Sequence, residues 1–140
     1  MRYFTIKELC QSNTAAKYKI DNSPSSSVEA NLVQLVDNIL DPLRARYGRP
    51  IHVSSGYRSK RLNSAVGGVS NSQHLYGQAA DILGHDRSIG ETKKLFQLIQ
   101  DMRLPFDQLI LEHSRYGSYW VHVSYSPKNR RQVIGNMLKK

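Results

Sequence analysis

Residues 72–81 read SQHLYGQAAD and hold a histidine, His74, and an acid, Asp81, seven positions apart. Gly77 lies between them and allows a tight turn, so both side chains can face one point without the i, i+4 spacing of a helical metal motif. The run that follows, residues 79–83, is predicted to be a strand. The pair is therefore expected where a loop enters a strand.

A second histidine lies in residues 119–125, which read YWVHVSY and are rich in aromatic and β-branched residues. The two-residue period of a strand places Trp120 and His122 on one face. A lone histidine on a strand is more often structural than a ligand, but two imidazoles and a carboxylate are what a catalytic zinc ion needs, because three protein ligands leave the fourth tetrahedral position for water. We expect His74, Asp81 and His122 to bind one Zn²⁺ in a hydrolase.

Three segments of the chain carry a family resemblance: SGYRS at 55–59, Ser-x-His-x-x-Gly-x-Ala-x-Asp at 72–81 and Trp-x-His at 120–122. In this order and with similar separations, they resemble the M15-type zinc D-Ala-D-Ala carboxypeptidases and endolysin peptidases, which share the Hedgehog/DD-peptidase fold. The likeness extends from about Tyr3 to Val133. It implies zinc bound by the three residues above and an enzyme that cleaves peptide bonds in the peptide stem of bacterial peptidoglycan.

The resemblance also implies that Arg58 lies near the substrate. Its fixed charge and planar donor fork suit either a substrate carboxylate or a developing oxyanion, and the sequence leaves both open. We expect Ser72, Gln73 and Trp120 to line the substrate cleft. Ser72 could equally cap the turn before His74, and the tryptophan could equally be a core residue.

The proton carrier departs from the family pattern. Several members have an acid three residues before the last histidine ligand, where this chain has Tyr119, a poor base at neutral pH. Glu112 ends an apolar run, and a short loop containing a glycine then leads to the strand of His122, which predicts a hairpin. Glu112 is therefore our predicted general acid/base, with His113 second and Asp107 third.

The order of elements predicts an α+β fold. Apolar residues at a 3.6-residue period predict a long amphipathic helix over 28–47, interrupted at Pro42, and another from about 88 to before Pro105. Strands are expected at 51–54 and 79–83, and a hairpin at 108–112 and 119–125. We expect a loop over 13–27, and a small antiparallel sheet with helices on one face and the metal cleft on the other.

Composition limits the remaining classes. The 140 residues are expected to form one zinc peptidase domain, with a basic tail from about 128. A single cysteine, Cys10, excludes an intrachain disulfide and a thiolate zinc cluster. The net charge of +9 suits anionic wall polymers or nucleic acid, but no recognition helix or stacking platform supports a nucleic-acid partner. A monomer is expected.

Localisation is inferred from what the chain lacks. No secretory signal and no run of membrane-spanning length are visible, so we expect a protein made in the cytoplasm that acts on the cell wall, as a phage or prophage lysis product does. Two other functions stay open. One is a zinc-holding but inactive cell-wall-binding module, because Tyr119 replaces the acid; the other is a basic nucleic-acid-binding protein.

Overall fold

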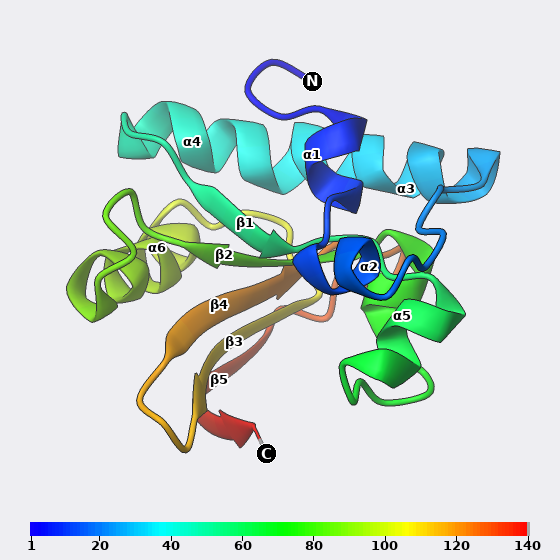
Figure 1. The fold of residues 1–140 in the computed structure, drawn as a ribbon. Helices are drawn as coiled ribbons and strands as arrows, with labels where there is room; N and C mark the ends of the chain where they lie inside the picture. Colours follow the sequence, from blue (N-terminus) through cyan, green and yellow to red (C-terminus); the bar gives the residue numbers. More distant parts are fainter. Residues whose placement is uncertain (140) are drawn as a thin grey trace.

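The computed structural model describes residues 1–139, and its centre is a five-stranded sheet in the order β1-β2-β4-β3-β5 (Figure 1). The strands are β1 (His52–Ser55), β2 (Ala79–Leu83), β3 (Gln108–Ser114), β4 (Tyr119–Ser124) and β5 (Gln132–Lys139). The neighbours from β1 to β3 pair antiparallel, whereas β5 pairs parallel with β3. The α+β class is confirmed, and the sheet is mixed where an antiparallel one was expected.

The helices are α1 (Ile6–Cys10), α2 (Asn13–Lys17), α3 (Ser26–Leu35), α4 (Asp41–Tyr47), α5 (Lys60–Ala65) and α6 (Ile89–Asp101), with a π-helical turn η1 (Val36–Leu40) and a 3₁₀ turn η2 (Gln73–Tyr76). A serine or threonine side chain accepts a backbone N–H at the start of most of them. Such a cap on Ser12 begins α2, so the segment 13–27 contains a helix where only a loop was expected.

The predicted long helix forms as α3, η1 and α4 in succession, with the irregular turn immediately before Pro42. A proline inside a helix lacks the N–H for the ladder, and its ring crowds the carbonyl four residues earlier. The π-helical turn widens the backbone there, which lets the helix continue past the proline. Gly48 ends it in the left-handed conformation, at φ +74°.

One face of the sheet is apolar and packs on the helices. Its buried side chains alternate along the strands and are Ala80, Ile82, Leu109, Leu111, Val121 and Val123. They form one core with Leu32, Leu35 and Ile39 of the long helix and Leu95 and Ile99 of α6. Because successive strand residues point to opposite faces, this packing turns the side chains of Asp81 and His122 to the other face.

The hairpin of β3 and β4 is confirmed, with Glu112 opposite Trp120 in the register. The C-terminal segment differs from the expected basic tail, because residues 132–139 pair with β3 from Gln108↔Gln132 to Ser114↔Lys139. Lys140, also counted in that tail, lies outside the described residues. Within residues 1–139, no helix combines the length and apolarity needed to cross a membrane.

Candidate metal centre

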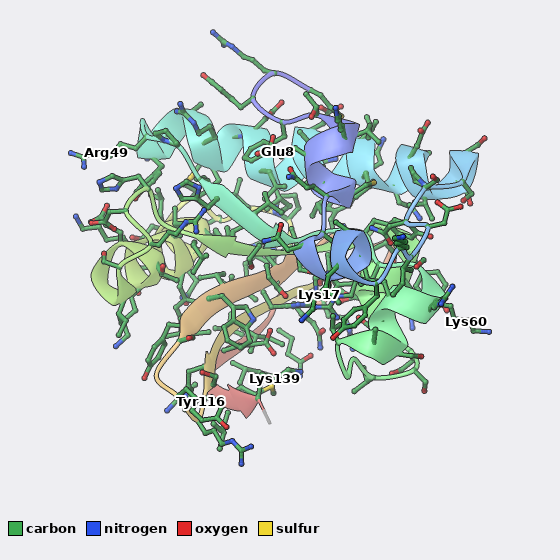
Figure 2. All side chains as sticks on the ribbon, in the orientation of Figure 1. Glu8, Lys17, Arg49, Lys60, Tyr116 and Lys139 are labelled. Carbon is green, nitrogen blue, oxygen red and sulfur yellow. The ribbon has the colours of Figure 1, made fainter. Side chains whose placement is uncertain are left out.

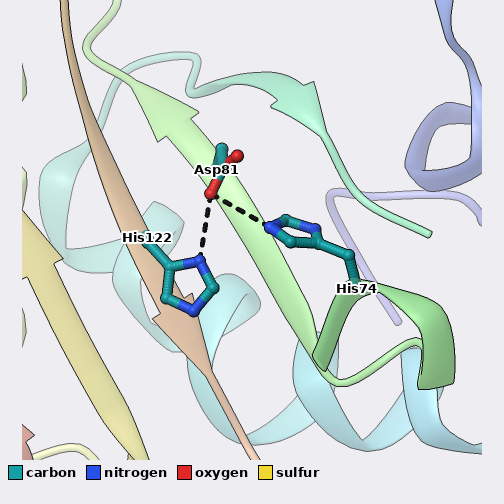
Figure 3. Close-up of side chains that lie close together, drawn as sticks. All are labelled: His74, Asp81 and His122. Carbon is teal, nitrogen blue, oxygen red and sulfur yellow. Dashed lines mark hydrogen bonds and ion pairs between the residues drawn. The ribbon is translucent and has the colours of Figure 1, made fainter. Parts of the chain in front are cut away.

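Three predicted ligands converge on the polar face of the sheet (Figure 3). Asp81 on β2 and His122 on β4 are register partners in neighbouring strands, so the sheet itself sets their side chains next to one another. His74 comes from η2, where Ser72 caps the turn and Gly77, at φ +71°, leads the chain out toward β2. The glycine-containing turn thus does what the spacing predicted.

Asp81 joins both imidazoles through a single oxygen. Its Oδ1 lies 3.2 Å from His74 Nε2 and 3.2 Å from His122 Nδ1. The three ligand atoms are all within 4.8 Å of one another, and His74 and Asp81 are almost fully buried. This separation leaves room for one cation between the three atoms.

The hydrogen bond on the far side of His74 decides which nitrogen can bind a metal. His74 Nδ1 lies 2.7 Å from the carbonyl oxygen of Gly56, which can only accept, so Nδ1 carries the proton. In neutral His74 the lone pair is then on Nε2 and faces the carboxylate of Asp81. Acceptors that face one another across a buried site need a cation between them, so a set of two nitrogens and one oxygen fits zinc.

Asp81 is held in its charged form. Burial favours the protonated acid, but the positive charge available from His74 and hydrogen bonds from His122 and His74 outweigh it and keep the pKa well below its usual range. An anionic oxygen is thus present between two imidazoles.

The ligands lie at the edge of a cleft of about 960 Å³, which is also lined by Arg58, Ser72, Gln73, Glu112 and Trp120. The structure therefore brings every predicted site residue to one cleft. His113 is not among the cleft-lining residues within 1–139, and its ring stacks on Tyr119 with centroids 5.2 Å apart. That position does not favour the proton role considered for it.

Glu112 is buried on β3 beside the ligands. Its Oε1 accepts a hydrogen bond from Trp120 Nε1 at 3.0 Å and lies 3.9 Å from His122 Nδ1. Its Oε2 lies 3.2 Å from Nζ of Lys139, near the end of β5 (Figure 2). The sequence analysis missed this lysine, although the apolar residues of VIGNML at 133–138 were a signal for a strand.

Asp107, the third candidate for the proton role, is instead the centre of a buried network. Its carboxylate accepts from Arg130 Nε at 2.8 Å and from Gln73 Nε2 at 2.8 Å. The bonded Arg130 guanidinium holds the pKa of Asp107 well below its usual range, although burial acts in the opposite direction. The network ties the segment before β5 to the turn that carries His74.

A test of the Asp107 network follows from its pKa. Because the folded-state pKa lies below the unfolded value of about 3.9, the carboxylate stabilises the fold above about pH 4, and this contribution is lost as pH falls. Asp107→Asn is expected to lower the free energy of unfolding at neutral pH by about 1–3 kcal/mol, and the difference from wild type should shrink in acid. Urea unfolding at both pH values measures it; a difference that does not depend on pH would contradict the assignment.

Gly56 must be glycine because the backbone passes close to α1. A Cβ on Gly56 would come 2.1 Å from the carbonyl oxygen of Leu9. Gly56→Ala is therefore expected to lower the free energy of unfolding by about 1–3 kcal/mol. The control is Gly90→Ala in α6, where the added Cβ meets open space and alanine favours the helix. Thermal unfolding compares the two, and a Gly56→Ala protein as stable as wild type would be contrary to this packing.

Comparisons with known proteins agree with this site. The family model described as peptidase M15 matches residues 2–124. A zinc D-Ala-D-Ala carboxypeptidase of Streptomyces albus G is 35% identical over 79 residues, which are 56% of this chain and 30% of that protein. The chain thus covers less than a third of the length of this curated relative. With its match over most of its length, the chain belongs to the peptidase M15 family.

Proposed function

We propose that the protein is a zinc-dependent metallopeptidase that hydrolyses peptide bonds in bacterial peptidoglycan, as a D-Ala-D-Ala carboxypeptidase or an endolysin-type endopeptidase. The observation that carries the proposal is the convergence of His74 Nε2, Asp81 Oδ1 and His122 Nδ1 beside a wide cleft. Membership of the peptidase M15 family and the likeness to a protein named zinc D-Ala-D-Ala carboxypeptidase support it.

The residues around the ligands supply the rest of the chemistry. Bound zinc would lower the pKa of water and polarise the scissile carbonyl. Glu112 accepts the proton of the attacking water on its carboxylate and returns it to the leaving amine. The indole N–H of Trp120 holds Oε1 of Glu112 in place, 3.9 Å from His122 Nδ1.

Substrate contacts are assigned to the cleft-lining side chains. Arg58, on the floor of the cleft, offers a donor for a carboxylate or an oxyanion. Ser72 and Gln73 flank His74 and offer polar groups to the peptide backbone, and the face of Trp120 packs an alanyl methyl or a sugar ring.

A second candidate function is a zinc-holding module that binds wall peptides without cleaving them. One observation favours it: Glu112 is tied by both oxygens, to Trp120 and to Lys139, as a structural ion pair is. Turnover separates the two functions, because only a peptidase releases fragments.

The experiment uses purified peptidoglycan and defined muropeptides, with mass analysis of the products. We expect fragments from the protein as purified, their loss after treatment with a chelator, and their return on addition of zinc. The masses identify the bond cleaved. Retained binding to the wall with no fragments under any zinc condition would favour the second function.

A further inference from the structure

Arg58 directs three of its N–H groups at three different acceptors. Nη2 donates to Oδ2 of Asp81 at 3.3 Å, Nε donates to Oγ of Ser55 at 2.9 Å, and Nη1 donates to Oδ1 of Asn63 at 3.3 Å. Its side chain is only 15% exposed. The guanidinium is a rigid plane, so fixing two of these contacts fixes where the third one points.

Asn63 on α5 is the contact least able to move. It is 3% exposed, and its Nδ2 donates to the carbonyl oxygen of Val69 at 2.8 Å. A carbonyl can only accept, so the amide nitrogen faces Val69 and the amide oxygen faces Arg58. A Cβ on Gly68 would come 2.0 Å from that oxygen, which shows how closely the surrounding backbone encloses it.

The two oxygens of Asp81 are thereby given different partners. Oδ1 faces both imidazoles at 3.2 Å, whereas Oδ2 faces Arg58. A carboxylate that bound a cation through both oxygens would have to give up its contact with the guanidinium. The arginine thus favours coordination through Oδ1 alone, which leaves a coordination position for water.

We propose that Asn63 is a positioning residue that acts through Arg58 to hold Asp81 in one-oxygen coordination. The inference rests on the proposed zinc site and names a residue that touches neither metal nor substrate. It separates two roles of Arg58, because orienting Asp81 affects metal binding, whereas contacting substrate affects only KM and kcat.

The test measures the zinc dissociation constant by competition with a chromophoric chelator, and the absorption spectrum of the cobalt(II) form, which reports coordination number. Asn63→Ala is expected to weaken zinc binding about tenfold and to alter the cobalt spectrum, as loss of an outer-shell partner does elsewhere. Arg58→Gln should weaken binding at least as much, and Arg58→Lys should fall between, because an ammonium keeps the charge but not the fork.

The matched control is Asn22→Ala. Asn22 holds the same segment from outside, donating to the carbonyl oxygens of Cys10 and Tyr57 and accepting from the N–H of Ser59, but it does not contact the Arg58 side chain. Its zinc affinity is expected to match wild type. All variants are first shown to be folded by thermal unfolding of the metal-free forms, and the partly exposed Arg58 variants carry the test if Asn63→Ala does not fold.

Two results overturn the inference while leaving the proposed function intact. One is wild-type zinc affinity in Asn63→Ala, or in Arg58→Gln where that variant carries the test; the other is an equal loss in Asn22→Ala, which would reveal only a loosened segment. A wild-type protein that binds no zinc would instead overturn the proposed function, and this inference with it.

Discussion

His74→Ala is expected to reduce zinc affinity more than any other single change in the protein. Loss of a partner behind a ligand costs about 10–100-fold in metal affinity, so loss of the ligand itself is expected to exceed about 100-fold. The variant also removes the imidazole whose Nδ1 is fixed by Gly56, so no other nitrogen takes its place at Asp81. Metal content after dialysis, together with competition titration, measures the effect.

The control for His74→Ala is His52→Ala. His52 Nε2 bonds the backbone carbonyl of His85, on a part of the structure that does not include the three ligands. This variant should keep a full equivalent of zinc. If His74→Ala also kept a full equivalent at unchanged affinity, His74 would have to be removed from the ligand set.

Glu112→Gln is expected to lower the turnover number by about 10²–10⁴-fold while zinc binding is kept, because the amide cannot accept the proton of water. Glutamine has nearly the same volume and retains an oxygen for the indole N–H of Trp120, so the cleft keeps its shape. Steady-state hydrolysis of a defined muropeptide and zinc content are measured on the same preparation.

His113→Ala is the companion to Glu112→Gln, since its ring stacks on Tyr119 and is absent from the residues of the described chain that line the cleft. Its turnover is expected to equal that of wild type. Unchanged turnover in Glu112→Gln would move the proton role to another residue, and a large loss in His113→Ala would identify that residue as the histidine.

The ligand set and the fold class were predictable because each depends on short-range patterns. A glycine turn between His74 and Asp81 and the alternation around His122 fix the direction of three side chains, and amphipathic periods fix the helices. Glu112 followed from the hairpin, because a short loop sets the register of its two strands. These are local properties that a single sequence states directly.

What could not be predicted depends on contacts between distant segments. Asn63 reaches Arg58 only because α5 folds back over the loop after β1, and nothing in its own neighbourhood indicates this. The basic residues around 128–131 hid β5, although one of them, Arg130, is bonded to the buried carboxylate of Asp107. A charge run indicates a solvated end only until a partner is found for its charges.

The register of β2 and β4 has a consequence for how the protein acquires its metal. Asp81 and His122 are rungs of one ladder, and β2 and β4 also carry the apolar core on their other face, so the ligands are preorganised by the same packing that folds the chain. Small zinc modules fold only as the ion binds. Here the ordering entropy is met by the core, and the free energy of binding goes to affinity.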